Sequence, residues 1–279
     1  MPISTMLVPL GSDPHERRIL RYACGLSAQS VRRVLVATVI DDSGMEAPVV
    51  AAEMDRARQR LAEWTRAAAK GCPMELETRV VTGDPTGAIL ALAQQADVDV
   101  ICCSTEGKTL LEALFSGSIS EELFASGKVR TMTVRNELLD SVDDPAQLAR
   151  DFAKRLVVPT DFSASATRAW LSAVERPSEA IGTLYAIHVV APGDENERRN
   201  AKILLNGLLD MAREHGTEAK CEIFESSDPG QAVLDFLDAV SATGVITGQR
   251  GRGTFRRAIL GGLSLRLLRE APCPVVVQP

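Results

Sequence analysis

The sequence predicts an α/β protein built from two similar domains, each a parallel sheet covered by helices. The chain repeats its own motifs at a nearly constant offset, and within each half short apolar runs alternate with longer amphipathic ones, as in right-handed βαβ units. Only 4% of the residues are aromatic, so Ala, Val, Leu and Ile must fill the core, which suits buried parallel strands. The 279 residues are enough for two domains of about 150 residues each.

An internal repeat relates the two halves. The segment LVPLGSD, which begins at Leu7, is similar to VVPTDFS, which begins at Val157. The matched pairs are Pro9 with Pro159 and Val39 with Val189 at an offset of 150, then Pro85 with Pro229, Gly107 with Gly251 and Gly117 with Gly261 at an offset of 144. The offset changes in the loop and helix after the second strand, where differences in length are tolerated. Ordered matches of this kind predict a tandem duplication.

The elements of the C-terminal half follow one another in a regular order. Apolar runs rich in β-branched residues predict strands at 156–160, 183–190, 219–224, 244–247 and 274–277. Amphipathic stretches between them predict helices at 165–175, 197–214 and 229–240, and from 262 onward. The helix at 229 has a recognisable start, because Ser227 and Asp228 suit a cap and Pro229 suits the first turn.

Composition limits the domain boundaries and the function classes. The polar and acidic stretch 137–153 predicts a linker between a first domain, 1–136, and a second, 154–279. A net charge of −6 argues against nucleic-acid binding. No uncharged apolar run reaches the 18 to 20 residues that cross a bilayer, and the N-terminus lacks a signal peptide's basic region, so we expect a cytoplasmic protein. None of the six cysteines has metal-ligand spacing, and we expect reduced structural thiols.

The segment 248–262, GQRGRGTFRRAILGG, leaves a predicted strand and enters the last predicted helix. Glycine lets backbone N–H groups face an anion without a Cβ in the way, and a helix N-terminus adds unpaired donors, so the segment suits phosphate. The arginines at 250, 252, 256 and 257 could add charge to such a site. The alternative is that the glycines only turn the chain and the arginines form a solvated face. His188 ends a strand without an evident catalytic partner, so we expect a packed histidine, no catalytic residue and no metal site.

These features together resemble the universal stress protein family. The motifs that carry the resemblance are V-P-x-D after the first strand (Pro159, Asp161), His188-Val189 ending the second, Asp228-Pro229 before the third helix, and Gly248-x2-Gly251-x9-Gly261. They recur in the expected order, and the resemblance covers nearly the whole chain twice. It implies a tandem universal stress protein whose two Rossmann-like domains, similar to adenine nucleotide alpha hydrolases, each hold five parallel strands in the order 3-2-1-4-5.

The resemblance implies ATP, with or without Mg²⁺, at the carboxyl edge of the second sheet. Asp161 and Val189 are expected to face the adenine and ribose, and the glycines the phosphates. The full set of expected cofactor-binding residues is Pro159, Asp161, Val189, Thr247, Gly248, Gly251, Arg252, Gly261, Gly262 and Leu263. The family's phosphate-binding Ser or Thr is replaced here by Gly262, which keeps an amide but loses a hydroxyl, and Ser264 lies two residues further on.

The first domain departs from the family pattern in a different way. Gly11 stands at the aspartate position and Ser104 at the first glycine. The residues that still match, and so form a second-tier site, are Val39, Gly107, Gly117 and Ser118. Because the second domain keeps the direct anchors, we expect the nucleotide there.

Three functions remain open from the sequence. The first is an adenine-nucleotide-binding protein that acts in stress response and signalling without catalysis. The second is a nucleotide-free scaffold that uses the paired domains to bind other proteins, and the third is a slow ATPase or nucleotidyl transferase. The two domains are expected to pack as a pseudo-dimer through the last strands, 129–134 and 275–277, and two chains could associate further as a homodimer.

Overall fold

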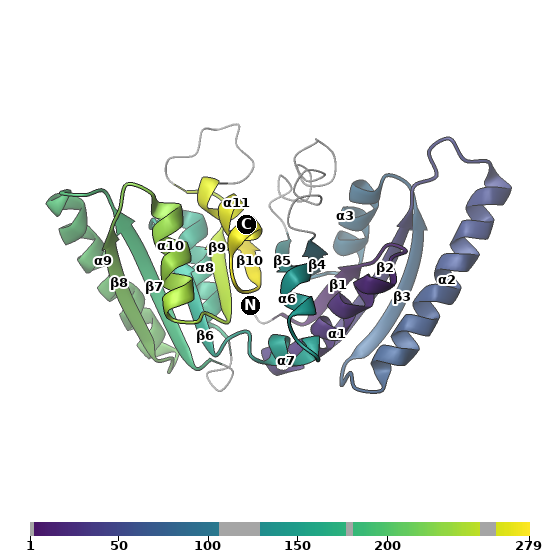
Figure 1. The fold of residues 1–279 in the computed structure, drawn as a ribbon, viewed down its shortest axis with the longest axis horizontal. Helices are drawn as coiled ribbons and strands as arrows, with labels where there is room; N and C mark the ends of the chain where they lie inside the picture. The colour runs from purple at the N-terminus through teal and green to yellow at the C-terminus, as the bar shows by residue number, and fades with distance from the viewer. Residues whose placement is uncertain (1–2, 106–128, 177–180, 252–260) are drawn as a thin grey trace. The chain divides into compact units, whose positions relative to one another are not determined.

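A computed structural model of the protein describes residues 3–105, 129–176, 181–251 and 261–279. The chain divides into an N-terminal unit, Ile3–Arg150, and a C-terminal unit, Asp151–Pro279 (Figure 1). The described strands are divided between these two units.

The N-terminal unit contains a parallel sheet with the strand order β3-β2-β1-β4-β5. Its strands are β1 (Thr5–Pro9), β2 (Arg33–Ile40), β3 (Glu75–Thr82), β4 (Val100–Thr105) and β5 (Arg130–Arg135). Its helices are α1 (Arg17–Gly25), α2 (Ala47–Ala69), α3 (Pro85–Gln95), α6 (Asn136–Asp140) and α7 (Pro145–Arg150), with 3-10 turns η1 (Pro14–Glu16) and η2 (Leu26–Gln29). The stretch predicted as a linker therefore contains α7 and most of α6.

The C-terminal unit repeats this plan with the strand order β8-β7-β6-β9-β10, and its strands are also parallel. Its strands are β6 (Arg155–Pro159), β7 (Thr183–Val190), β8 (Ala219–Glu225), β9 (Gly244–Gly248) and β10 (Val275–Gln278). Its helices are α8 (Ala164–Val174), α9 (Glu195–Glu214), α10 (Pro229–Ala239) and α11 (Gly262–Glu270). In chain order this is the arrangement 3-2-1-4-5 in both units, which confirms the predicted fold class.

The repeat extends to individual backbone bonds. Pro9 pairs with Ala37 in one sheet and Pro159 with Ile187 in the other. The next residue along each first strand then donates its amide to the same partner, at 2.7 Å for Leu10 and 2.8 Å in the second unit. The duplication inferred from sequence motifs thus holds at the level of strand register.

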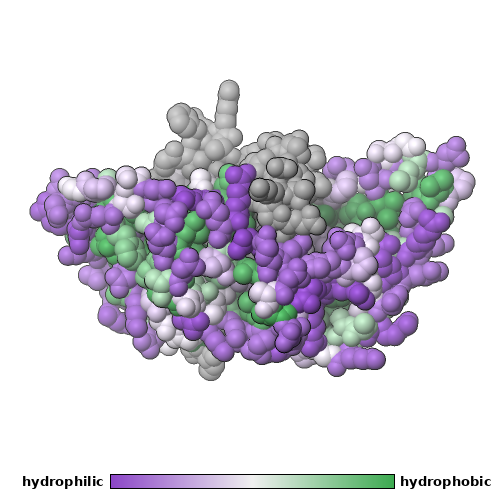
Figure 2. Space-filling view, viewed as in Figure 1, coloured by the Kyte–Doolittle hydropathy of each residue, from purple (hydrophilic) through white to green (hydrophobic). Residues whose placement is uncertain are grey.

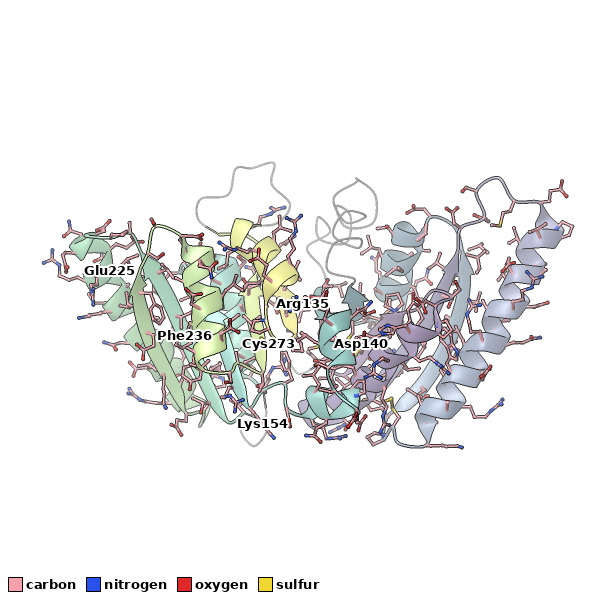
Figure 3. The ribbon with its side chains drawn as sticks, in the orientation of Figure 1. Arg135, Asp140, Lys154, Glu225, Phe236 and Cys273 are labelled. Carbon is pink, nitrogen blue, oxygen red and sulfur yellow. A yellow bond between two sulfur atoms is a disulfide. The ribbon has the colours of Figure 1, made fainter. Side chains whose placement is uncertain are left out.

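Helices cover both faces of the second sheet because its right-handed crossovers move in one direction along the sheet from β6 to β8 and in the other direction from β8 to β10. Helices α8 and α9 pack together on one face, and α10 and α11 on the other (Figure 1). Trp170 of α8 is fully buried, and its indole N–H donates to the carbonyl of Leu208 in α9 at 3.1 Å. On the opposite face Phe236 of α10, marked in Figure 3, lies 5.5 Å from the ring of Tyr185 and 5.3 Å from that of Phe224. The packing of these aromatic side chains anchors α8 and α10 to the sheet.

The expectation that all cysteines are reduced is wrong for one pair. Cys24, at the end of α1, forms a disulfide with Cys72, which lies between α2 and β3. The two residues are 48 positions apart, and the fold brings their Cα atoms to 4.9 Å. Cys102, Cys103, Cys221 and Cys273 are not disulfide-bonded.

The surface seen in Figure 2 is mostly hydrophilic. Among the described residues, the exposed large hydrophobic side chains are Met45, Val49, Ile203 and Leu204. No helix in the described part of the chain is both long and apolar enough to span a membrane.

Candidate functional site

The candidate site lies at the carboxyl ends of β6 and β9 in the C-terminal unit. These strands are neighbours, with Leu156 beside Gly244 and Val157 beside Val245. The chain leaves β6 for α8 on one face of the sheet and leaves β9 toward α11 on the other. A reversal of this kind opens a crevice at the carboxyl edge, where open α/β sheets hold their ligands.

The turn after β6 is held by its own side chains. Thr160 Oγ1 accepts a hydrogen bond from the amide of Phe162 at 3.0 Å, and Asp161 Oδ1 accepts one from the amide of Ser163 at 3.0 Å. Phe162 takes a left-handed φ of 60°, which is uncommon for a residue with a side chain. Ser163 then caps α8 by accepting from the amide of Ala166 at 3.3 Å. The Asp161 carboxylate is thereby fixed beside the end of β6.

The segment after β9 is tied to three neighbouring elements. The amide of Gln249 donates to the carbonyl of Gln278 in β10 at 2.7 Å, and its carbonyl accepts from the amide of Gly261 at 2.9 Å. The carbonyl of Arg250 accepts hydrogen bonds from the hydroxyls of Ser163, at 3.2 Å, and Ser165. The backbone at 249–251 is therefore held between the start of α8, the start of α11 and β10.

Two of the predicted glycines are closely packed, Gly248 against backbone and Gly251 against the Asp161 side chain. A Cβ at Gly248 would lie 2.7 Å from the backbone nitrogen of Ala166 and from the carbonyl carbon of Ser165. A Cβ at Gly251 would lie 2.6 Å from Asp161 Oδ2. The alternative that the glycines only turn the chain is therefore incomplete, because they allow β9 and the segment after it to contact the turn after β6.

The start of α11 differs from the other helix starts near the sheet edge. Its N-cap is Gly261, which has no side chain to accept from the first amides, whereas α8, α9 and α10 are each capped by a Ser or Asp side chain. Among the described residues, no atom lies within 4 Å of the position a Cβ at Gly262 would take, and Gly262 is exposed. The first amides of a helix have no partner within it and carry a partial positive charge. In the described part of the chain, no side chain caps this end of α11.

Ser264 has a structural role that the sequence left undecided. Its side chain is 3% exposed, and its hydroxyl donates to the carbonyl of Gly248 at 2.7 Å. The hydroxyl thus joins the end of β9 to the first turn of α11. With its hydrogen donated to Gly248, it does not replace the hydroxyl lost at Gly262.

An ion pair links α11 to α10. Arg266 Nη1 lies 2.8 Å from both carboxylate oxygens of Asp228, and Nη2 donates to Gln231 Oε1 at 2.6 Å. Hydrogen bonds from Arg266 and from the Gln231 amide lower the pKa of Asp228 below its ordinary value. Asp228 also caps α10, so one carboxylate fixes the start of α10 and the position of α11.

His188 is a packed side chain, as the sequence predicted. It is 5% exposed, and its Nδ1 lies 2.7 Å from the carbonyl of Thr160, which requires Nδ1 to carry the proton. The ring centroid lies 4.7 Å from that of Phe162, and Nε2 lies 3.6 Å from Glu197 Oε1. In the N-terminal unit the equivalent residue is Thr38, whose hydroxyl donates to the carbonyl of Leu10 at 2.8 Å. His188 therefore supports the turn that carries Asp161.

The other predicted residues of this unit lie around the same edge. Pro159 is buried at the end of β6, and Val189 is half-buried two positions beyond the last residue of β7 that pairs with β6. Thr247 is 3% exposed, with its hydroxyl 3.4 Å from Ser264 Oγ, and Leu263 is half-buried in the first turn of α11. Arg252 lies outside the described residues.

The equivalent edge of the N-terminal unit is built differently. Gly11 replaces the aspartate, and its amide donates to the carboxylate of Glu16, so this amide is already engaged. A Cβ at Gly11 would lie 2.9 Å from Glu16 Oε1. Val39 is half-buried on β2, and Ser104 is half-buried on β4. The remaining second-tier residues, Gly107, Gly117 and Ser118, lie outside the described residues.

The side chains that hold the site together were not predicted from the sequence. Ser163 and Ser165 anchor the carbonyl of Arg250, and Gln249 connects β10 to α11. A serine just before an amphipathic run indicates a helix cap, so Ser163 could have been found from the sequence. The described residues contain no group of three or more His, Cys, Asp or Glu side chains arranged to hold a metal ion.

The fold and the carboxyl edge of the C-terminal sheet together define a class of protein. It is a tandem α/β protein in which a helix begins with glycines at the switch point of the sheet. A profile of the universal stress protein family matches residues 2–135 and again 153–279. The chain therefore belongs to the universal stress protein family, with two copies of the domain.

Three universal stress proteins are similar to this chain over part or most of its length. A universal stress protein of Methanocaldococcus jannaschii is 27% identical over 138 residues, which cover 44% of this chain and 81% of that protein. The crystal structure of a universal stress protein from Archaeoglobus fulgidus aligns over 98% of this chain and 95% of its own, at 24% identity and a TM-score of 0.76. Another universal stress protein structure from that organism, in complex with dAMP, aligns with 45% of this chain and 97% of its own, at 23% identity and a TM-score of 0.38.

Proposed function

We propose that this protein binds ATP or a related adenine nucleotide at the carboxyl edge of the C-terminal sheet, and that it acts in stress response and signalling without turnover. The observation that carries the proposal is the uncapped start of α11 beside the fixed segment 249–251. Both follow the carboxyl end of β9, next to β6, at the switch point of the sheet.

The phosphates are assigned to the start of α11. Gly262 is exposed, and no atom of the described residues lies within 4 Å of the position its Cβ would take, so a ligand oxygen can approach the backbone there. Helix N-termini of this kind hold phosphate through backbone N–H groups and the helix dipole. The amides of Leu263 and Ser264 follow in the same turn.

The adenine and ribose are assigned to the ends of β6 and β7. Asp161 is half-buried, and its carboxylate is oriented by the Ser163 amide, so it is placed to accept a hydrogen bond from a ribose hydroxyl or an adenine amino group. Val189 lies at the same edge and offers backbone groups and an apolar surface to the base. Thr160 and His188 keep this turn in place.

The experiment is a calorimetric titration with MgATP that compares wild type with Gly262→Pro. Proline is tolerated at the first position of a helix, and Gly261 already has the extended conformation that precedes a proline, with ψ of 150°. The substitution therefore removes one N–H donor while leaving α11 formed. A hydrogen bond to a charged group is worth about 1.5–3 kcal/mol, so the affinity should fall by about 10- to 150-fold.

Gly262→Ala is the matched control, because it keeps the amide and its Cβ meets nothing within 4 Å. Its affinity should stay within about twofold of wild type, since nothing is lost. Wild-type protein that gives no heat with MgATP or other adenine nucleotides would favour the nucleotide-free scaffold instead. Equal affinities for Gly262→Pro and Gly262→Ala would show that the phosphates do not bind at this helix start.

A further inference from the structure

The disulfide in the N-terminal unit lies where the segment after β5 is attached to α1. Cys24 is in the last turn of α1 and is 2% exposed, whereas Cys72 is half-buried in the connection from α2 to β3. Their Cα separation of 4.9 Å lies in the ordinary range for disulfides. Burial raises the pKa of the free thiol of Cys103 to about 12 and that of Cys221 to about 11, which makes both poor nucleophiles.

The residue after Cys24 is in direct contact with α7. A Cβ at Gly25 would lie 2.2 Å from the carbonyl oxygen of Ala146 and 2.7 Å from the Cβ of Ala149. The backbone of α7 therefore lies directly on the end of α1, and any movement of this end changes the surface on which α7 rests.

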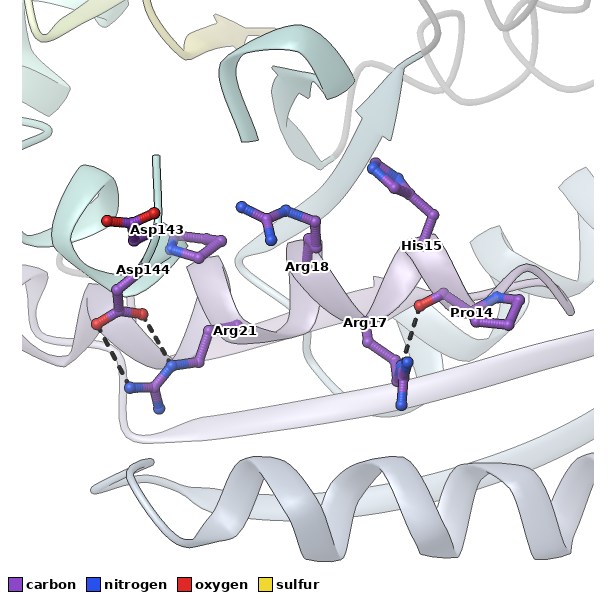
Figure 4. A pocket seen from close by; sticks show the side chains of 8 residues that line it. Pro14, His15, Arg17, Arg18, Arg21, Asp143 and Asp144 are labelled. Carbon is purple, nitrogen blue, oxygen red and sulfur yellow. Dashed lines mark hydrogen bonds and ion pairs between the residues drawn. The ribbon is translucent and has the colours of Figure 1, made fainter. Parts of the chain in front are cut away.

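Arg21, one turn before Cys24, connects the same segment to the residue before Cys72. Its Nε lies 2.9 Å from Asp144 Oδ1 and its Nη2 3.4 Å from Oδ2 (Figure 4), while Nη1 donates to the carbonyl of Gly71 at 3.4 Å. A Cβ at Gly71 would lie 2.6 Å from Nη1, so this contact is close. One guanidinium thus contacts both the cysteine loop and the segment that follows β5.

Asp144 is the carboxylate that receives these bonds. It also accepts from the amide of Ala146 at 3.1 Å and from Arg150 at 3.3 Å. Burial opposes ionisation, but the hydrogen bonds from Arg21 and the Ala146 amide outweigh it and lower the pKa of Asp144. Beside this contact, α1 and residues 143–145 border an open groove of about 490 Å³ (Figure 4). Residues 141–150 are thus held on α1 by the packing of buried Ala146 and Ala149 and by hydrogen bonds from Arg21 to Asp144 and from Arg18 to the carbonyl of Val142, with an open groove beside them.

We propose that Cys24 and Cys72 form a reversible thiol–disulfide switch that sets how firmly residues 141–150 are held on α1. In the oxidised state the disulfide fixes the loop at Gly71. The carbonyl of Gly71 then holds the Arg21 guanidinium where it binds Asp144. In the reduced state the loop is released, and Arg21 loses its hydrogen bond to the carbonyl of Gly71. Arg21 then holds Asp144 less firmly, so residues 141–150 open more often.

The oxidant is a small-molecule disulfide such as oxidised glutathione. The more exposed Cys72 thiolate attacks one of its sulfurs, forming a mixed disulfide and expelling one glutathione thiolate. The Cys24 thiolate then attacks the Cys72 sulfur, forming the protein disulfide and expelling the second. Two protein thiols are oxidised, one glutathione disulfide is reduced to two thiols, and the two protons pass to the leaving groups.

The C-terminal unit lacks this pair, although it repeats the fold. At the repeat offsets, Val174 stands where Cys24 does and Gly216 where Cys72 does. The second unit therefore serves as an internal reference that reduction of this disulfide should leave unchanged.

The chemical step is tested by counting thiols. Full-length protein is treated with oxidised glutathione, denatured and alkylated, and its mass is compared with that of protein reduced first. Of the six cysteines, we expect four labels in the oxidised sample and six after reduction, with Cys24 and Cys72 as the difference. Labelling of all six without reductant would overturn the proposal.

The structural step is tested by hydrogen exchange measured by mass spectrometry on the oxidised and reduced protein. Amides of 141–150 should exchange about tenfold faster after reduction, because exchange reports local opening, while those of β6 should not change. The variant Cys24→Ser/Cys72→Ser should exchange fast under both conditions, and the matched control Cys221→Ser should behave like wild type. Equal protection of 141–150 in the two states, with the disulfide confirmed by mass, would overturn the switch.

Discussion

The packing of Gly248 gives a direct test of how the site is assembled. In Gly248→Ala the new Cβ would lie 2.7 Å from two backbone atoms at the start of α8. Two non-bonded carbon atoms in ordinary contact lie about 3.5 Å apart, so β9 and α8 must separate by roughly 0.8 Å. Neither backbone atom can rotate away, and overpacking of this kind costs about 1–3 kcal/mol.

Differential scanning calorimetry measures this cost as a lower Tm for the C-terminal unit. For a unit of this size the loss corresponds to roughly 5–10 °C. Gly262→Ala is the control, because its Cβ meets nothing within 4 Å and alanine is favoured over glycine in a helix, so its Tm should equal or slightly exceed that of wild type. If Gly248→Ala proved as stable as Gly262→Ala, the close approach of β9 to α8 would be wrong.

Two further predictions concern charge and turnover. The folded pKa of Asp228 is lowered, so its contribution to stability is present above the unfolded pKa of about 3.9 and is lost as the pH falls through the folded value. Thermal unfolding below pH 4 should therefore show a smaller acid-induced loss for Asp228→Asn, which keeps the cap but not the charge, and an identical loss would contradict the ion pair with Arg266. Phosphate release from ATP should not exceed that of Asp161→Ala, because the described residues near the crevice include no evident base or metal cluster; faster release by wild type would revive the slow ATPase.

Much of the fold was predictable because it depends on local patterns. Apolar strands and amphipathic helices follow from periodicity, and the duplicated motifs at Pro9 and Pro159 reflect one strand register used twice. The strand order was available only through the family resemblance, since periodicity does not say which strands are neighbours. The cap at Asp228 was readable because its signal is confined to adjacent residues.

The parts that were not predictable depend on contacts between distant residues. Cys24 and Cys72 are 48 positions apart, and no spacing rule pairs them before the fold is known. The hydroxyl of Ser264 could have faced a ligand or the protein, and only the position of Gly248 decides between them. The sequence likewise indicated why Gly251 could suit phosphate, but not that Asp161 occupies the space of its missing side chain.

The central claim is that backbone amides at the start of α11 bind the phosphates. Nuclear magnetic resonance of ¹⁵N-labelled protein tests it most directly, by titration with ATP and, separately, with adenosine. ATP should shift the amide signals of Gly262, Leu263 and Ser264, whereas adenosine should shift only signals near Asp161 and Val189. Saturation with ATP that leaves the three α11 amides unmoved would contradict the account.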